Sequence, residues 1–204
     1  MSDEHALGLR ERKKLDTRRA LSDAALQLAF ERGLEHVTRE DIAARAGVSV
    51  RTFTNYFTGK YDAIAYRQTE RIRRSLALLR ERPAGEPLWT AVSAALLAPL
   101  EAEGATDMVP SAAQLTETRK LLAIPELRFA ISKEATEDWV EVIAERTSTD
   151  PHHDLYPRLV AGVIAAVGEA TMLAYVHADP PVPVTTVLRQ ALAEVAAGLP
   201  DPQR

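Results

Sequence analysis

The sequence has 204 residues, of which 46% are hydrophobic and 26% charged, with a formal net charge of −4. These values are typical of a globular protein with enough chain for one large domain or two small ones. Cysteine is absent, which excludes a disulfide framework and a thiolate metal site and suits a reducing compartment. Because the first twenty residues contain no apolar run of the signal-peptide type, we expect a cytoplasmic protein.

Charge is distributed unevenly along the chain. Residues 1–82 carry 17 Lys and Arg against 12 Asp and Glu, a net charge of +5. Residues 83–204 carry 8 against 17, a net charge of −9. A basic front and an acidic back indicate that only the front of the chain meets a polyanion.

Four helices are expected in the basic front, and capping residues mark their ends. Gly33 can end the first helix in a left-handed conformation, and Gly47 can separate two short helices that begin at Thr38 and Ser49. These helices are expected up to Gly33, over about 38–46 and 49–57, and from about Lys60 to Arg82.

The segment PAGEP at 83–87 is the clearest break in the chain. No strand pattern is visible on either side of it, and the abundance of Ala and Leu favours helices. The sequence therefore predicts an all-α protein of about nine helices. Those behind the break are expected over about 88–103, 111–124, 125–147, 158–177 and 183–197.

Residues 38–60, TREDIAARAGVSVRTFTNYFTGK, carry the most informative pattern. Two short helices joined by a tight turn at Gly47 have the layout of a helix-turn-helix. Ala43 is small where the two helices would cross, and apolar side chains at Ile42, Val48 and Phe53 would fix the crossing angle. The outer face of the second helix holds Val50, Arg51, Thr54 and Asn55. Their side chains can reach base edges or phosphates in a major groove.

A basic arm precedes the motif and supplies an independent electrostatic signal. Short helix pairs with a central glycine also occur in proteins that bind no DNA, and a run of basic residues is often only a solvated helix face. The two signals together favour DNA binding. The arm consists of Arg10, Arg12, Lys13, Lys14, Arg18 and Arg19.

The segment AARAGVSVRTFTNYFTGKYDAI, preceded by FERGLEHVT, resembles the TetR family of transcriptional repressors over roughly residues 10–65. Helix lengths, turn glycine, Tyr-Phe pair and following lysine all coincide. The resemblance implies a homodimer on double-stranded, pseudo-palindromic operator DNA, released by a small-molecule inducer. It also implies a DNA-binding domain with its basic arm over residues 1–60, a connecting helix over 61–82, and a ligand-binding and dimerisation domain over 83–204.

The resemblance also assigns DNA contacts residue by residue. Tyr56 matches a position that touches phosphate, Lys60 matches the family's phosphate-binding lysine, and Thr38 matches a phosphate-contacting helix start. Thr54 departs from the Tyr or Phe of many members, so the operator sequence cannot be read from the motif. The contacts implied for the recognition helix come from Val50, Arg51, Thr52, Thr54, Asn55 and Tyr56.

The back half offers candidates for a pocket that would take a largely apolar inducer. RKLLAIPELR resembles a subgroup whose C-terminal domain is described as binding acyl-CoA-like ligands. Arg119 can meet an anionic ligand head, but a surface position is favoured for it. For each other candidate taken individually, ordinary core packing is favoured. The candidate wall residues are Trp89, Met108, Phe129, Trp139, Met172 and Tyr175.

Two apolar helices at the end of the chain predict a homodimer. Residues 159–176 are nearly all apolar but contain Glu169, which favours a core and dimer helix over a membrane span. Stripes on this helix and the last one would form a four-helix interface between two subunits. The stripes comprise Val163, Val167, Ala170 and Ala174, then Val184, Val187, Leu188, Ala191, Leu192 and Val195.

Neither a metal site nor an enzyme is predicted. His152, His153 and Asp154, with His177 or Glu169 as further ligands, lack the spacing of a built metal site. No phosphate-binding glycine loop, Gly-x-Ser-x-Gly elbow or His-Glu-x-x-His motif is present, so no cofactor is expected. The alternatives left open are a DNA-binding dimer without a small-molecule sensor and, less favoured, an all-α enzyme with scattered catalytic residues.

Overall fold

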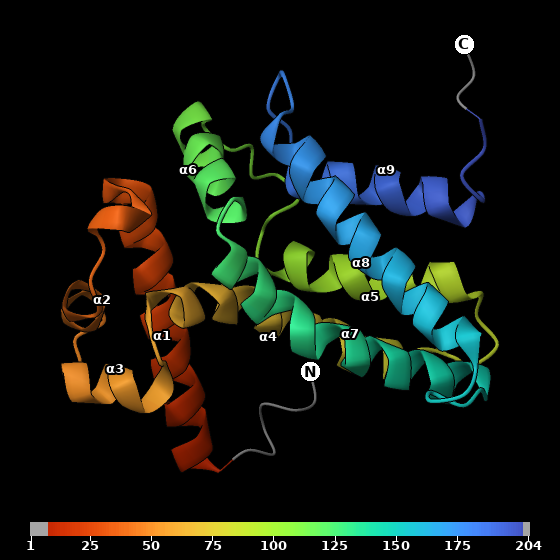
Figure 1. The fold of residues 1–204 in the computed structure, drawn as a ribbon, viewed down its shortest axis with the longest axis horizontal. Coiled ribbons are helices and arrows are strands. Elements are labelled where there is room, and N and C mark those ends of the chain that lie inside the picture. Colours follow the sequence, from red (N-terminus) through yellow and green to blue (C-terminus); the bar gives the residue numbers. More distant parts are fainter. Residues whose placement is uncertain (1–7, 202–204) are drawn as a thin grey trace. The chain divides into compact units, whose positions relative to one another are not determined.

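The structure is a computed structural model that describes residues 8–201, apart from the side chains of residues 128–135. Within these residues it contains nine α-helices, one short 3-10 helix and no strand, so the predicted all-α class is confirmed. In chain order (Figure 1) they are α1 (Leu9–Arg32), η1 (Leu34–His36), α2 (Arg39–Arg45), α3 (Val50–Tyr56), α4 (Lys60–Glu81), α5 (Leu88–Ala102), α6 (Ala112–Leu122), α7 (Pro125–Thr147), α8 (Leu155–Val176) and α9 (Val184–Ala196).

The chain divides into two compact units. The first unit contains the described residues up to Gln68 together with Lys120–Ile131, and the second contains Thr69–Arg119 and the described residues from Ser132 onward. The division falls inside α4, between the boundaries expected after residues 60 and 82. The segment Lys120–Ile131 was expected in the domain over 83–204 but belongs to the first unit. Its Leu121 and Leu127 are buried in the core of that unit.

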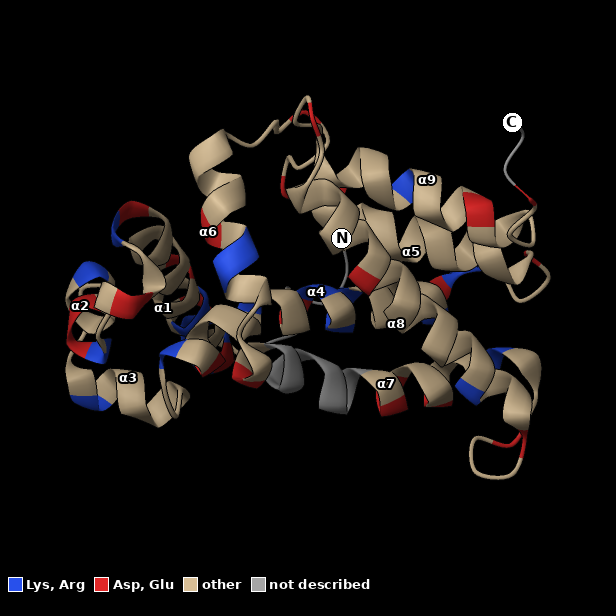
Figure 2. Ribbon diagram, turned by 45° about the horizontal axis from the view of Figure 1, so that its top comes forward, with Lys and Arg blue, Asp and Glu red and all other residues tan. Residues whose placement is uncertain are grey.

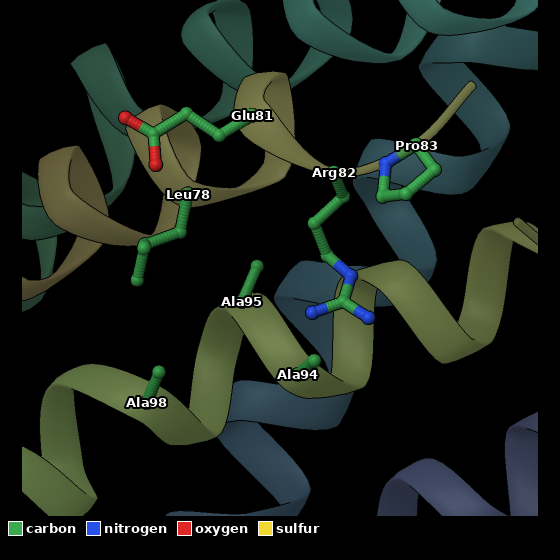
Figure 3. Close-up of a pocket in the computed structure, with 7 residues that line it drawn as sticks. All are labelled: Leu78, Glu81, Arg82, Pro83, Ala94, Ala95 and Ala98. Atoms are coloured by element: carbon green, nitrogen blue, oxygen red, sulfur yellow. The ribbon is translucent and has the colours of Figure 1, made fainter.

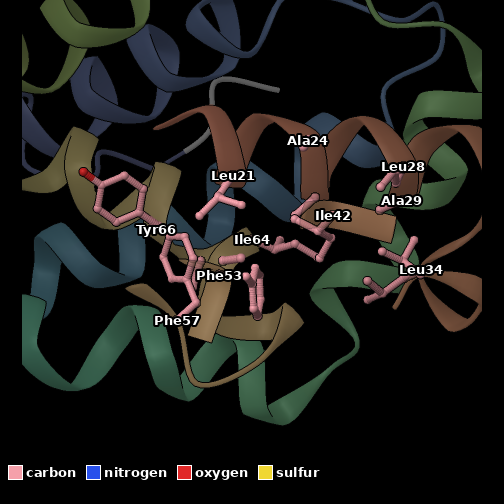
Figure 4. Close-up of a cluster of buried hydrophobic side chains, with 14 of the residues drawn as sticks. Leu21, Ala24, Leu28, Ala29, Leu34, Ile42, Phe53, Phe57, Ile64 and Tyr66 are labelled. Carbon is pink, nitrogen blue, oxygen red and sulfur yellow. The ribbon is translucent and has the colours of Figure 1, made fainter. Parts of the chain in front are cut away.

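The core of the first unit holds the short helices in place (Figure 4). Leu21 and Leu28 lie seven residues apart on one face of α1, and both are buried. They contribute to one cluster with Ile42 of α2 and Phe53 of α3, which are fully buried. Phe57 follows α3, and its ring packs against Phe53 with ring centroids 5.9 Å apart. The packing of Ile42 and Phe53 agrees with their predicted role at the helix crossing.

The second unit has its own core, in which α9 packs on both α5 and α8. Val92, Ile143 and Leu192 belong to the most deeply buried side chains of this core. Arg146 of α7 closes one end of the unit. Its guanidinium donates hydrogen bonds to the carbonyl oxygens of Arg82, Pro83 and Glu86 at 3.2, 2.7 and 3.0 Å, which fixes the turn between α4 and α5.

Six of the ten residues predicted to form the dimer stripes lie in or against the core of the second unit, which corrects that part of the sequence interpretation, whereas Ala170 and Ala174 are exposed. Val167, Leu188 and Leu192 are buried in the core of the second unit, and Val163, Ala191 and Val195 pack against that core. The outward face of α8 instead carries Leu155, Leu159 and Leu173, which are 76%, 57% and 52% exposed. The prediction failed because α8 is apolar almost all round, so its periodicity does not reveal which apolar face meets the core.

Helix α8 is long and apolar enough to cross a membrane by length and composition, with a mean hydropathy of 1.9 over its most apolar stretch. Core helices of globular proteins pass the same test, so this is weak evidence of a membrane span. Only 33% of that stretch is buried within the chain. Helix α8 therefore has apolar surface that its own chain does not cover.

Candidate nucleic-acid interface

A capping box defines the start of α2. The hydroxyl of Thr38 accepts a hydrogen bond from the amide of Asp41 at 3.1 Å and donates one to the Asp41 carboxylate at 2.6 Å. The amide of Thr38 donates to the same carboxylate at 3.1 Å. These hydrogen bonds, with Arg32 nearby, hold the pKa of Asp41 below its usual value. The exposed Thr38 side chain is thus fixed by Asp41, a role that the sequence interpretation did not assign to this carboxylate.

The turn between α2 and α3 depends on Gly47, whose φ of +68° lies in the left-handed region. An added Cβ would meet no atom within 4 Å there, so glycine is favoured by the backbone conformation and not by lack of space. Ser49 then caps α3, because its hydroxyl accepts a hydrogen bond from the amide of Thr52 at 3.0 Å. Turn and cap together fix where α3 begins relative to α2.

Helix α3 turns one polar face outward. Arg51, Thr54 and Asn55 are exposed, whereas Phe53 on the opposite face is fully buried. The hydroxyl of Thr54 donates to the carbonyl of Arg51 at 3.0 Å, so this side chain lies against its own helix. The guanidinium of Arg51 has no carboxylate partner among the described residues. It is therefore available to a nucleic acid.

The other residues implied for the recognition helix are only partly buried. Val50 and Tyr56 pack at the edge of the cluster around Phe53, and each keeps some exposed surface. The hydroxyl of Thr52 forms a hydrogen bond of 2.8 Å with that of Ser49, which strengthens the cap. The structure therefore brings the implied residues to one region of the first unit, with Arg51, Thr54 and Asn55 furthest into solvent.

Lys60 has a structural role that the motif does not reveal. Its ammonium donates hydrogen bonds to the carbonyl oxygens of Leu34 and Val37 at 2.8 and 3.1 Å. These carbonyls belong to the turn immediately before Thr38. An ammonium has three donors, so one N–H remains for a phosphate. Only the fold brings these carbonyls beside a lysine more than twenty residues away, and no local sequence signal indicates it.

Arg18 of the basic arm lies against aromatic rings. Its guanidinium carbon is 5.4 Å from the ring centroid of Phe57 and 4.6 Å from that of Tyr66. A guanidinium over a ring face is attracted by the ring quadrupole. Arg18 is therefore committed to the core of the first unit, unlike the basic residues nearer the start of α1.

The candidate ligand-pocket residues do not share one environment. Trp139 is buried in the core, Trp89 is partly buried against it, and Met108 is 59% exposed. Arg119 donates from Nε to the carbonyl of Val176 at 2.9 Å, at the end of α8. Met172 and Tyr175 are partly buried, and burial raises the pKa of Tyr175. The side chain of Phe129 lies outside the described residues.

A groove in the second unit lies elsewhere, between the end of α4 and α5 (Figure 3). Its volume is about 280 Å³. Arg82 extends from the end of α4 toward Ala94, and its guanidinium pairs with Glu86. That pairing holds the pKa of Glu86 below its usual value. The lining consists of Leu78, Glu81, Arg82, Pro83, Ala94, Ala95 and Ala98, none of which was among the candidates.

The histidine-containing loop before α8 is organised by a carboxylate. Asp150 accepts hydrogen bonds from the amides of His152 and His153 at 2.7 and 3.0 Å, and it contacts the His153 ring at 3.1 Å. These contacts lower the pKa of Asp150 to about 2. The Asp154 carboxylate accepts from the amide of Asp150 at 2.7 Å. Among the described residues, no group of three His, Cys, Asp or Glu side chains is placed to hold a metal ion.

A capped helix, a glycine turn and a second capped helix with an exposed polar face define a helix-turn-helix protein of the DNA-binding class. Residues 21–64 match the family described as bacterial regulatory proteins, tetR family, and residues 86–200 match the MftR C-terminal domain. The chain belongs to the TetR family of transcriptional regulators, as the resemblance implied. Its relatives are regulators and not enzymes.

Two relatives match most of the chain. The HTH-type transcriptional regulator TcmR of Streptomyces glaucescens is 34% identical over 179 residues, covering 84% of this chain and 79% of TcmR. The transcriptional regulator MftR of Mycobacterium tuberculosis is 31% identical over 194 residues, covering 92% of this chain and 93% of MftR.

Solved structures show the same fold at lower identity. A TetR-family regulator from Syntrophomonas wolfei has a TM-score of 0.64 at 14% identity and covers 93% of this chain and 100% of that chain. FadR of Thermus thermophilus, a repressor solved with lauroyl-CoA, has a TM-score of 0.54 at 20% identity and covers 92% and 97%. At these identities the likeness establishes the fold alone.

Proposed function

We propose that this chain is a cytoplasmic, ligand-responsive repressor that binds a pseudo-palindromic operator as a homodimer and is released by a largely apolar small molecule. The observation that carries the DNA-binding part is the polar face of α3. Arg51, Thr54 and Asn55 are exposed there, while Phe53 behind them is fully buried and Ser49 caps the helix. A rigidly held helix with such a face suits a major groove.

The contacts to DNA divide into two kinds. Arg51 and Asn55 would reach base edges, because a guanidinium and an amide can each make two hydrogen bonds to a purine. Thr38, Tyr56 and Lys60 would contact phosphates, Lys60 through the one N–H not directed at Leu34 or Val37. Val50, Thr52 and Thr54 would add contacts of lesser strength, Val50 by packing on a thymine methyl group.

Dimerisation is supported by the outward face of α8. Leu155, Leu159 and Leu173 are exposed, and between them Gly162, Ala166 and Ala170 continue the same face at spacings of three and four residues. An apolar helix face of this length is rarely left uncovered in a globular monomer. Small residues at its centre allow the same helix of a second subunit to approach closely. A dimer also supplies the second recognition helix that a two-fold operator requires.

A ligand site is proposed within the second unit. Its apolar helices resemble in fold those of FadR from Thermus thermophilus, which was solved with lauroyl-CoA. The groove between α4 and α5 has a volume close to the lower limit for small-molecule sites. A ligand that binds one arrangement of α4 better than another would shift the population of DNA-competent dimers.

The DNA-binding part is tested by selecting bound sequences from random duplex DNA with the full-length protein. We expect a two-fold-symmetric motif whose half-sites are about one helical turn apart or slightly more. Matched selections with Arg51→Ala should give a motif that is relaxed at particular base pairs. Recovery of no enriched sequence by the folded protein at low salt contradicts the proposal.

The ligand-sensing part needs a separate experiment. The affinity for the selected operator should be measured with and without lauroyl-CoA, and with and without free fatty acids of several lengths as probes. We expect at least one apolar probe to weaken operator binding. If probes bind the protein while its operator affinity stays constant, the alternative of a DNA-binding dimer without a sensor is favoured.

A further inference from the structure

Six cations of the first unit are engaged by other groups of the protein. Arg18 stacks on aromatic rings, and the ammonium of Lys60 is directed at main-chain carbonyls. Acidic and basic residues are interspersed over α1 and α2 (Figure 2). Four arginines are held by carboxylates in the pairs Arg32–Asp41, Arg39–Glu40, Arg45–Glu31 and Arg67–Asp23.

Five cations of the part of this unit that the structure describes lack such a partner. Arg51 lies on α3, and Arg10, Arg12, Lys13 and Lys14 lie in the first two turns of α1, all exposed and without a carboxylate partner among the described residues. A phosphate competes poorly for a cation already bound to a carboxylate, whereas an unpaired cation gives up only water and counterions. The positive charge available to a polyanion is therefore concentrated at two places, α3 and the start of α1.

The start of α1 extends beyond the core. The helix begins at Leu9, but its first buried residue is Leu21. At 1.5 Å per residue, about 18 Å of helix precedes Leu21. Figure 1 shows these first turns continuing past the helix-turn-helix. Arg18 in this stretch stacks on Phe57 and Tyr66, but residues 9–14 are all exposed and would be free to lie along another molecule.

The cations of this extension are not distributed evenly round the helix. At 100° per residue, Arg10, Lys13 and Lys14 fall within an arc of about 100°, and Leu21 falls inside the same arc. Arg12 lies on the opposite side. Since Leu21 packs into the cluster that contains Phe53 of α3, the basic face of α1 (Arg10, Lys13 and Lys14) is turned toward the side of α1 on which α3 lies.

We propose that the basic face of α1 binds phosphates of the operator duplex outside the base pairs that α3 reads, as a second DNA-contacting surface. The inference rests on the proposed function. It adds a rigid helical extension whose reach is at most about five base pairs, at 3.4 Å per base pair. The surface carries no sequence preference, because its contacts are to backbone phosphates and not to base edges.

The test compares two duplexes that carry the selected operator, one trimmed to the half-sites and one with flanks of random sequence. Affinities of the full-length protein are measured as a function of salt concentration. The central variant is the triple substitution Arg10→Gln, Lys13→Gln, Lys14→Gln. The matched single variants are Lys13→Gln and Arg12→Gln, which are adjacent and lose the same charge, but only Lys13 lies on the basic face of α1, and Arg12 lies about 100° away round the helix. Circular dichroism checks that each variant is folded.

On the flanked duplex, the triple variant should bind about tenfold more weakly or worse. The slope of its logarithmic salt dependence should become shallower by about 0.9 for each phosphate that the variant no longer neutralises. Lys13→Gln should weaken binding more than Arg12→Gln does. On the trimmed duplex, the affinities of wild type and triple variant should be nearly the same.

If the triple variant binds the flanked duplex with the same affinity as wild type, the inference is overturned. The reading of the operator by α3 is unaffected by that result. Equal effects of Lys13→Gln and Arg12→Gln on the affinity also overturn it. They would show that binding depends on the net charge of the protein and not on one face of α1. Failure of the wild-type protein to bind any duplex defeats the proposed function itself.

Discussion

The ammonium of Lys60 donates a hydrogen bond of 2.8 Å to the carbonyl oxygen of Leu34, which joins the start of α4 to the turn before α2. A second hydrogen bond, to Val37, shares the same ammonium. The position that the family resemblance marks as a phosphate contact is thus also a link inside the DNA-binding unit. Substitutions at Lys60 must be interpreted with both roles in mind.

Lys60→Met should destabilise the protein even without DNA. The substitution keeps most of the aliphatic side chain but removes the ammonium that donates both hydrogen bonds, and it leaves the carbonyls of Leu34 and Val37 without their charged partner. Hydrogen bonds to charged groups contribute about 1.5–3 kcal/mol each, so we expect a loss of that order in the free energy of unfolding. Urea denaturation measures it, with Lys14→Met as an exposed control. Equal stability of the two variants contradicts the structural role.

Base contacts and phosphate contacts should separate by their dependence on operator sequence. Arg51→Ala and Asn55→Ala are expected to lose about 1–3 kcal/mol of discrimination at particular base pairs. Tyr56→Phe should instead weaken binding to all sequences by a similar factor and reduce its salt dependence. Competition binding with single-base operator variants distinguishes the two. An unchanged preference profile for Arg51→Ala would show that this side chain reads no base.

Leu121→Ala should destabilise the DNA-binding unit although residue 121 lies far from the motif in sequence. Its side chain is 7% exposed and belongs to the cluster around Phe53 and Phe57. Truncating a buried leucine costs about 2–5 kcal/mol. Hydrogen exchange of the α2 and α3 amides should report the loss, and Met108→Ala, at a 59% exposed position, serves as the control. Unaltered exchange in α2 and α3 would show that residues 120–131 do not support the motif.

Local signals were enough to predict the helix-turn-helix. Thr38, Gly47 and Ser49 act through their own caps and turn, so residue type and spacing specify the structure. The contacts of Lys60 and Arg18 could not be predicted in this way. Their partners, Leu34 and Phe57, come from other elements of the fold, and a lysine or arginine in a basic segment carries no sign of an internal partner.

The back half was predicted less well because its pattern is less informative. The helices were found, but α8 is apolar on most sides, so Val163 and Val167 were placed at a dimer interface although they lie in or against the core. Met108 was among the candidate wall residues, and it lies in an exposed loop. Which large apolar side chain lines a pocket depends on the packing of helices, and single-residue hydrophobicity does not encode that.

The loop before α8 should titrate in acid. The pKa of Asp150 is lowered to about 2 by hydrogen bonds from His152 and His153. A carboxylate with a depressed folded pKa contributes stability above its unfolded pKa of about 4, and that contribution is lost as the pH falls toward 2. Carbon-detected NMR of the Asp150 carboxyl group should show this low midpoint. Asp150→Asn should remove the part of the acid-induced loss of stability that comes from this carboxylate. A midpoint near 4 contradicts the contacts.

The outward face of α8 should be the dimer interface. Leu159 is 57% exposed on this apolar face, between Leu155 and Gly162. In a dimer, Leu159→Glu would bury a charge without a partner, which is costly, whereas in a monomer it would remain in water. Sedimentation equilibrium should give twice the 22.4 kDa chain mass for wild type and a shift toward 22.4 kDa for Leu159→Glu. Met108→Glu, another exposed apolar position, should remain dimeric.

The operator affinity of Leu159→Glu should fall together with its dimerisation, because a monomer presents a single recognition helix to a two-fold site. A stable dimer in Leu159→Glu would place the interface elsewhere, and a wild-type protein that sediments only as a 22.4 kDa species would contradict dimerisation itself.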